Sequence, residues 1–566
     1  MKTSLLVAGL FIMLSGCQSR DIEPLVAVDS LYINGNIITM VDNQRKAEAI
    51  AIKDGLIYAL GDKETLLKYQ GENTSIVDLA GKTLMPGFID PHSHFSTAIF
   101  MSDWVSLLSP PFGDVTNISD IRGKLQQHIK AKGIKKGQWI IGYGYDSDLL
   151  DEKRHLNKLD LDQMFPNTPI FINHVSMHMG VVNSKGLELL NITEQSVAPE
   201  GGSIVRMPRS NNPSGLLLEK SHSKALLSLP RPAIADLLNR NIKAAQQLYA
   251  SQGITTAQDG FSDKGLISLL QAAAYSKKLY IDLSVLVGTG GDTSIFDSYN
   301  FANSYSNHLK FGGIKIGLDG SPQGKTAYFS EPYLNSHNHG TVTVNQQTFN
   351  DVLLKAYQNN VQAYVHANGD GAVDMVLEGH KQADIVMGHA NSERRTVVVH
   401  SQFMRHEQLD RYSEYGFIPS YFSNHAFFWG DVHIKNLGQK RAEFLSPMAT
   451  SLKKGIIFTN HTDFPITPIN HLLSVTTAVE RKTRSGQILG ADERINIWQA
   501  LKAITINSAY QYREENSKGS LQAGKLADLV ILSQNPLTVA PQDIKDIKVV
   551  ETIKRGKTIF KLTSRE

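Results

Sequence analysis

Two histidines separated by one residue are the strongest chemical signal in the chain. His92 and His94 close the segment 86–94, which begins as an apolar run typical of a buried strand. Side chains at positions i and i+2 of a strand share a face, so both imidazoles should project together from the end of that strand. Two converging imidazoles form half of a metal site, although a lone His-x-His also occurs by chance.

Other apolar runs end in residues of the same kind. His366 closes the run at 364–366, His400 closes the run at 396–400, and Asp463 ends a further run two residues after His461. One such histidine is usually a core residue, but several at the strand ends of one barrel are harder to explain that way. A buried carboxylate such as Asp463 is costly unless it is paired or binds a metal. These residues are therefore candidates for a shared site.

Lys315 is unusual because it lies between two isoleucines in a strand-like run. A central parallel strand is buried on both faces, so a bare ammonium there needs a partner. An ion pair with Asp319 or extension to the barrel mouth would satisfy it. The alternative is reaction with carbon dioxide, which makes a carbamate able to bridge two cations. The residues alone leave both alternatives open.

Eight β-branched runs, several separated by helix-length segments, predict the framework that positions these residues. This alternation favours an α/β fold, a closed (β/α)8 barrel of TIM type, whose active site lies at the carboxyl ends of the strands. The gap between His94 and Gly253 is too long for one crossover helix, so we expect an inserted lid subdomain at about 100–250. The runs are 84–94, 253–260, 281–288, 312–320, 361–370, 394–401, 417–422 and 455–464.

The two ends of the chain share a texture of short strands and tight turns. Asn-Gly and Asp-Gly pairs between apolar runs are hairpin signals. We expect the segments 30–84 and 515–566 to form one composite β-sandwich, with the barrel occupying 85–514.

The N-terminus predicts export. Lys2 precedes an apolar stretch at 5–14, which is too short to span a bilayer, so residues 1–16 are expected to be a signal peptide. Residues 14–17 resemble a bacterial lipobox, which implies lipid attachment at Cys17 and a tether at 17–29. An ordinary secretory signal is the alternative. Gln18 favours the periplasmic face of the outer membrane of a Gram-negative bacterium.

Composition narrows the chemistry further. The chain has 57 Lys and Arg against 54 Asp and Glu, so it lacks the basic excess of a nucleic-acid-binding protein. Its single cysteine excludes an intrachain disulfide and a cysteine-rich zinc site. Any metal must be held by other residue types.

Together these motifs resemble the amidohydrolase superfamily, specifically the family 3 branch of deformylase-like and deacylase-like hydrolases. The resemblance covers nearly the whole mature chain, and its motifs are 86–94, 313–321, 365–367, 400–401 and Asp463 in the barrel, 142–146, His178, 182–184 and 213–219 in the insertion, and 34–35, 54–57 and 519–528 at the chain ends. One departure is His461, because the branch usually has Gly-Ser-Asp at the eighth strand.

The resemblance implies a role for each residue. His92 and His94 would bind one metal, the carbamate of Lys315 would bridge two, and His366 and His400 would hold the second. Asp463 would bind the first metal and act as the catalytic proton shuttle. Substrate-binding residues would be Tyr145, His178, Asp319 and His461.

The expected function is hydrolysis of a non-peptide or small-amide C–N bond by metal-activated hydroxide, with one or two divalent ions, best fitted by zinc. The expected partner is a small amide-type molecule, and no nucleic acid is expected. The protein would contact the membrane only through its lipid anchor. A homodimer is compatible with the sequence. Lactone or phosphoester hydrolysis, or an inactive ligand-binding lipoprotein, are the alternatives.

Two further sequence patterns are not part of the predicted metal site. Residues 320–326 resemble a phosphate-binding loop but are one residue short, so we expect a substrate-facing loop instead. His425, Trp429 and His433 either line the pocket or are surface residues.

Overall fold

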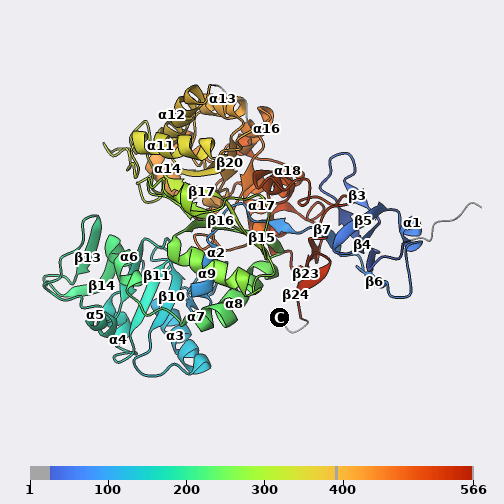
Figure 1. Ribbon diagram of the computed structural model, residues 1–566. Helices are drawn as coiled ribbons and strands as arrows, with labels where there is room; N and C mark the ends of the chain where they lie inside the picture. The colour runs from blue at the N-terminus through green and yellow to red at the C-terminus, as the bar shows by residue number, and fades with distance from the viewer. Residues whose placement is uncertain (1–25, 389–392, 564–566) are drawn as a thin grey trace, which may run out of the picture.

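The computed structural model describes residues 26–388 and 393–563 (Figure 1). Its central sheet has eight parallel strands in the order β21-β20-β19-β18-β17-β16-β15-β8. Each strand overlaps one of the eight predicted runs. Their bounds are β8 (Phe88–Ile89), β15 (Ile254–Ser262), β16 (Asp282–Gly288), β17 (Leu309–Gly317), β18 (Ala363–Ala367), β19 (Val397–His400), β20 (Ile418–Tyr421) and β21 (Thr459–Asn460).

Backbone hydrogen bonds join the two ends of this sheet. The N–H of Asp463 donates to the carbonyl of His92 at 3.2 Å, and the N–H of His94 donates to the carbonyl of Phe464 at 2.9 Å. The predicted TIM-type barrel is therefore confirmed. The first and last strands meet where His92, His94 and Asp463 lie.

Helices cover the outside of the barrel because their apolar residues recur with a helical period. In α11 (Gln346–Gln358), Phe349, Val352, Leu353 and Ala356 are buried, and Asn345 caps the helix by accepting from the N–H of Thr348. The others include α8 (Ile242–Ser251), α9 (Lys264–Tyr275), α12 (Asp370–Val386), α13 (His406–Tyr415) and α17 (His471–Glu480).

A separate lobe follows α2 (Phe95–Met101) and is visible beside the barrel in Figure 1. It contains α3 (Ile118–Lys132), α6 (Lys220–Leu227) and a six-stranded sheet with its own apolar core. The sheet strands are β9 (Val105–Ser106), β10 (Ile140–Tyr145), β11 (Ile170–His174), β12 (Met179–Val182), β13 (Gly202–Arg206) and β14 (Pro213–Glu219). The lobe falls within the predicted insertion; its action as a lid stays a prediction.

Strands from both chain ends pair in one sheet of order β24-β23-β22-β7-β2-β3. In it β22 (Leu529–Leu532) runs antiparallel to β7 (Thr83–Pro86), and the remaining strands are β2 (Asn36–Ile38), β3 (Lys46–Ala47), β23 (Val549–Lys554) and β24 (Lys557–Lys561). A second sheet contains β1 (Ser30–Ile33), β4 (Ala49–Lys53), β5 (Leu56–Gly61) and β6 (Ser75–Asp78). Ile50 of this sheet and Leu529 of the first belong to the same apolar cluster.

The predicted signal peptide at 1–16, Cys17 and most of the tether at 17–29 lie outside the described residues. Within the described ranges, no helix is long and apolar enough to cross a membrane.

Candidate metal centre

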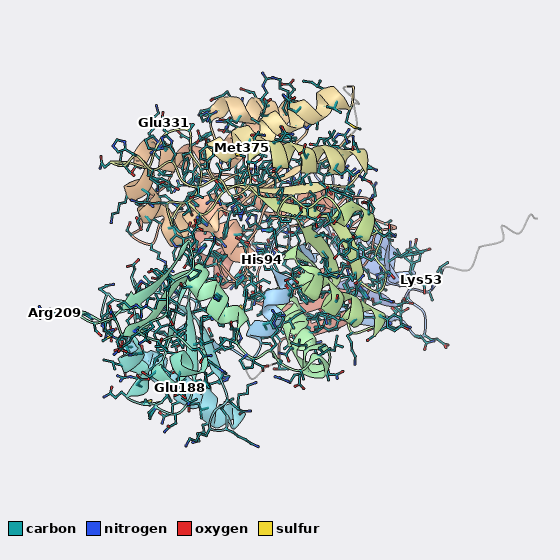
Figure 2. The ribbon with its side chains drawn as sticks, turned by 60° about the vertical axis from the view of Figure 1, so that its left-hand side comes forward. Lys53, His94, Glu188, Arg209, Glu331 and Met375 are labelled. Carbon is teal, nitrogen blue, oxygen red and sulfur yellow. The ribbon has the colours of Figure 1, made fainter. Side chains whose placement is uncertain are left out.

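Three of the predicted ligands converge where the barrel closes. The Oδ1 atom of Asp463 lies 3.4 Å from Nε2 of His92 and 3.4 Å from Nε2 of His94. Figure 2 shows His94 near the middle of the molecule. β8 and β21 end before these residues, so convergence comes from the loops after the strands rather than from strand alternation.

A chain of hydrogen bonds fixes which nitrogen of His92 carries a proton. The hydroxyl of Tyr512 donates to the carbonyl of Asp90 at 2.7 Å, so it accepts from the amide nitrogen of Gln258 at 3.0 Å. The amide oxygen of Gln258 then faces Nδ1 of His92 at 2.6 Å, and this nitrogen must donate. Nε2 of His92 is therefore left with a lone pair, which faces Nζ of Lys315 at 3.2 Å and Oδ1 of Asp463 at 3.4 Å.

This arrangement fits a divalent cation. Two acceptors, a lone-pair nitrogen and a carboxylate oxygen, face each other, and Oδ1 of Asp463 is buried without a hydrogen-bond partner in the described chain. Ligand atoms bound at 2.0–2.1 Å to a tetrahedral zinc lie roughly 3.3 Å apart, close to the separations observed here. Nitrogen or oxygen atoms of His92, His400 and Asp463 also lie within 4.8 Å of one another.

Lys315 reaches the same centre from β17. Its side chain is buried, and Nζ lies 3.2 Å from Nε2 of His92. The predicted ion pair with Asp319 is absent, because Asp319 instead accepts from the backbone N–H groups of Asn368 and Gly369. Burial lowers the pKa of Lys315 to about 8, although the charge of Asp463 opposes this change. A neutral amine is thus readily accessible at this position.

His366, His400 and His461 form a second row of imidazoles. Nε2 of His400 lies 3.0 Å from Nδ1 of His366, and Nδ1 of His400 lies 3.1 Å from Nε2 of His461. His461 in turn contacts the hydroxyl of Ser420 at 3.0 Å. His461 is fully buried and does not line the metal pocket, so its predicted contact with substrate stays a prediction.

The backbone is strained at two of these residues. His400 and Asp463 have φ angles of 75° and 52°, in the left-handed region that L-residues seldom adopt. Such strain persists where the surrounding structure holds the residue in a required orientation. Because Asp463 leaves the extended conformation, it does not share a strand face with His461.

Electrostatics keep the site ready for a cation. Burial lowers the pKa of His92 and of His400 well below its usual value, so both imidazoles are neutral. Burial alone would raise the pKa of Asp463, but its contact with His94 and the proximity of His461 and Lys315 lower it overall. Asp463 is consequently ionised at neutral pH.

These residues line a pocket of ≈ 360 Å³. His178 lines it while contacting Glu219 at 2.9 Å, and Asp319 lines it beside His366. Ser321, Pro322 and Gln323 place the loop at 320–326 on this pocket, as expected for a substrate-facing loop.

Tyr145, His425 and His433 differ from one another in how they relate to the metal pocket. Tyr145 is buried in the core of the insertion, where its hydroxyl contacts Nδ1 of His155, and it does not line the pocket. His425 and His433 are not surface residues: both are buried in α14 (Asn424–Leu437) with stacked rings. His425 lines the metal pocket.

Gln258 and Tyr512 were not identified as site residues. Gln258 is a polar interruption in the run that forms β15, which is a weak signal of a special role. Tyr512 follows α19 (Ile506–Gln511), far along the chain from the histidines, and no local pattern marks it.

Comparison with known proteins places this site in a family. The barrel fold, the histidines at the carboxyl ends of its strands and a pocket whose acceptors fit a cation are together typical of metal-dependent hydrolases. The amidohydrolase family model matches residues 75–560, so the chain belongs to the amidohydrolase family.

Individual relatives are similar along most of their length. YtcJ of Bacillus subtilis (strain 168) is 26% identical over 545 residues, covering 94% of this chain and 99% of the relative. An N-substituted formamide deformylase of Arthrobacter pascens is 26% identical over 550 residues, covering 93% and 97%. A solved structure of an uncharacterized metal-dependent hydrolase from Pyrococcus furiosus has a TM-score of 0.71 at 23% identity, covering 90% and 100%.

Proposed function

We propose that this protein hydrolyses a non-peptide C–N bond in a small amide-type substrate, using a divalent metal. The observation that carries this proposal is the convergence of His92, His94 and Asp463, with the lone pair of His92 turned toward the carboxylate. The name of the deformylase relative supports an amide-type bond and does not specify the substrate.

The donor set suits zinc because it offers neutral imidazole nitrogens and a carboxylate oxygen. His92, His94 and Asp463 would hold one ion, while His366 and His400 would hold a second if Lys315 becomes a carbamate that bridges them. Carbamate formation joins Nζ of Lys315 to the carbon of carbon dioxide and releases one proton. A bound divalent ion supplies a Lewis acid and lowers the pKa of water toward ~7.

Asp463 is the residue placed to move the proton. Its ionised carboxylate can accept a proton from water and deliver it to the leaving nitrogen. His461 is unsuited to this role because it lies behind His400, away from the pocket.

Purified protein reconstituted with zinc should hydrolyse members of a panel of formamides, acetamides and cyclic amides, and the metal-free protein should not. Turnover of lactones or phosphoesters without turnover of any amide would overturn the proposal. Metal content should be measured on the same samples by mass spectrometry.

We also propose that the mature chain is anchored at the cell envelope through lipid on Cys17, possesses a composite β-sandwich, and uses the insertion as a lid. The loop containing Ser176 and His178 lines the metal pocket, which supports a lid.

Cys17→Ser should move the protein from the membrane fraction to the soluble fraction; an unchanged distribution would contradict anchoring. Sedimentation of the soluble variant would show whether it dimerises.

A further inference from the structure

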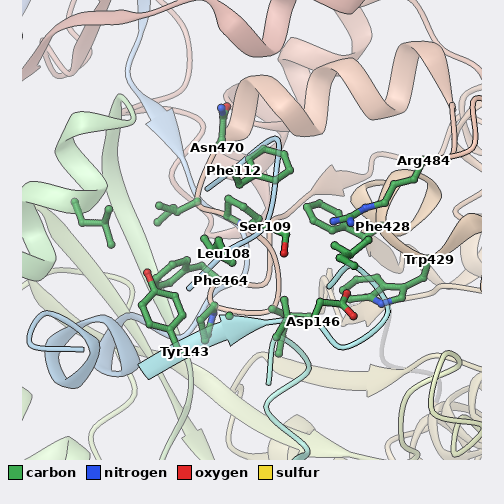
Figure 3. A pocket seen from close by; sticks show the side chains of 18 of the residues that line it. Leu108, Ser109, Phe112, Tyr143, Asp146, Phe428, Trp429, Phe464, Asn470 and Arg484 are labelled. Atoms are coloured by element: carbon green, nitrogen blue, oxygen red, sulfur yellow. The ribbon is translucent and has the colours of Figure 1, made fainter. Parts of the chain in front are cut away.

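A second pocket lies beside the metal pocket, and several aromatic side chains line it (Figure 3). We call it the aromatic pocket. It has a volume of ≈ 280 Å³, and its walls include Phe112, Tyr143, Phe428, Trp429 and Phe464. The rings of Phe112 and Phe428 are stacked with centroids 5.4 Å apart.

The two pockets are adjacent at three places. Ile466 lines both of them, on the segment that follows Asp463. In the insertion, Val175 lines the aromatic pocket and Ser176 lines the metal pocket. On α14, Trp429 lines the aromatic pocket and its ring lies 4.4 Å from that of His425, which lines the metal pocket. The aromatic pocket is therefore a direct neighbour of the metal pocket.

Two polar groups in this apolar setting lack partners. Nε of Arg484 and Oγ of Ser109 are both buried, and neither has a hydrogen-bond partner among the described residues. Figure 3 shows Arg484 reaching over Phe428 toward Ser109, with its guanidinium carbon 5.1 Å from the centre of the Phe428 ring. Buried donors without acceptors are costly, so this pocket is suited to a ligand that supplies an acceptor.

Asp146 also lines the pocket but does not satisfy Arg484. It accepts from the N–H of Asp148 at 3.0 Å and lies 3.7 Å from Nε2 of His174. The loop that carries Arg484 is held separately, because Ser485 donates to Asp431 on α14 at 2.6 Å. The guanidinium is thus held over the rings of Phe427 and Phe428, and Asp146 attracts it electrostatically, but Nε of Arg484 keeps a hydrogen that no acceptor among the described residues takes.

We propose that the aromatic pocket is a substrate subsite that binds an aryl group bearing a carboxylate. The carboxylate would accept from Arg484 and Ser109, while the aryl ring packs against Phe112, Phe428 and Trp429. This inference rests on the proposed function and narrows its substrate class to amides whose distal arm is an aryl carboxylate.

The test uses two probes that differ only in charge: 4-(formamidomethyl)benzoate and its neutral carboxamide. Wild-type protein should prefer the carboxylate probe in kcat/KM. Arg484→Gln should lower kcat/KM for the carboxylate by about 10- to 100-fold, the range expected for a charged hydrogen bond, and change it less than about twofold for the carboxamide.

Two further variants control for folding and general charge. Ser109→Ala removes a hydroxyl that has no partner in the described chain, so it should fold normally and weaken only the carboxylate probe. Lys482→Gln removes an exposed charge on the same segment and should change neither probe. Equal losses for both probes in Arg484→Gln, or no loss, would overturn the inference.

Calorimetry separates this inference from the proposed function. If wild-type protein turns over neither probe, binding of the carboxylate probe that depends on Arg484 would keep the subsite, and the panel of formamides, acetamides and cyclic amides would decide the proposed function separately. Absence of binding, or binding that does not depend on Arg484, would reject the subsite. Turnover of both probes without any effect of Arg484→Gln would keep the function and reject the subsite.

Discussion

The two ends of the barrel both bury charged groups, but they satisfy them differently. At the amino ends of the strands, Asp282, Glu514 and Asp528 meet Lys310, Lys518 and Lys554; we call these six residues the basal cluster. Lys554 lies 2.6 Å from Asp282 and 2.7 Å from Asp528, and Lys518 lies 2.5 Å from Asp282. Three cations pair with three anions.

At the carboxyl ends the groups do not neutralise one another. Lys315 forms no ion pair in the part of the chain that is described, and Asp463 faces imidazole nitrogens at 3.4 Å. Buried charges are tolerated when they are paired, so a structural role is sufficient to account for the basal cluster. The metal centre gains its full complement of partners only with an added cation, which indicates a functional site.

A substitution at the metal centre, where the charged groups are unpaired, should have the largest effect on activity. Lys315→Ala removes the amine that lies 3.2 Å from His92 and should reduce turnover below detection. Short-chain carboxylates such as acetate should restore part of the activity by replacing the lost anion. Kinetics with and without acetate test this, and full activity of Lys315→Ala would contradict a carbamate bridge.

Asp463→Asn should lower kcat by about 10²- to 10⁴-fold, because the substitution removes the proton acceptor while keeping the size of the side chain. Metal content must be measured alongside kcat, since Asp463 is also a proposed ligand. Retention of more than about a tenth of wild-type kcat would show that another residue moves the proton.

A substitution in the basal cluster, where the charged groups are paired, should reduce stability instead. Lys554→Met leaves Asp282 and Asp528 short of a partner and should reduce the free energy of unfolding by about 3–5 kcal/mol. Lys315→Met strands no carboxylate in an ion pair, so the metal-free variant should lose much less. Urea unfolding of the two variants, measured without metal, gives the comparison; equal losses would remove the distinction between the two ends.

His461→Ala should have a smaller effect on the metal centre. It removes the contact to Nδ1 of His400 and should weaken metal binding by about 10- to 100-fold, the usual cost of losing a group that orients a ligand. Competition with a zinc-binding dye measures this affinity. Unchanged affinity with altered substrate preference would instead support the substrate-binding role of His461 predicted from sequence.

The pH dependence of stability in metal-free protein should test the basal cluster separately from the metal centre. Burial by itself would raise the pKa of Asp282, but Lys554 and Lys518 hold it well below its usual range. Its stabilising contribution is complete above the unfolded-state pKa of about 3.9 and is lost as the pH falls through the lower folded-state value. The urea midpoint should depend less on pH below about 4 in Lys554→Met than in wild type.

The sequence was informative where chemistry follows local pattern. Eight β-branched runs predicted the barrel, because parallel strands buried on both faces need continuous apolar residues. His92, His94 and Asp463 stood at the ends of such runs. Their convergence could be predicted because the carboxyl ends of barrel strands meet on one face.

Other features depend on contacts between distant segments. Tyr512 meets Gln258 only in the folded chain, and Arg484 reaches Phe428 from a separate loop. Strand alternation does not relate His461 to Asp463, because both lie beyond the end of β21 and Asp463 takes a left-handed conformation. Backbone geometry of this kind is set by tertiary packing and leaves no local signal.

Crystals grown with zinc, with diffraction measured on both sides of the zinc absorption edge, test the central claim most directly. The account predicts an anomalous peak about 2.0–2.2 Å from Nε2 of His92, Nε2 of His94 and a carboxylate oxygen of Asp463. It also predicts no peak at the basal cluster. Absence of a peak at the carboxyl ends of the strands, with Nε2 of His92 protonated and donating to Asp463, would contradict it.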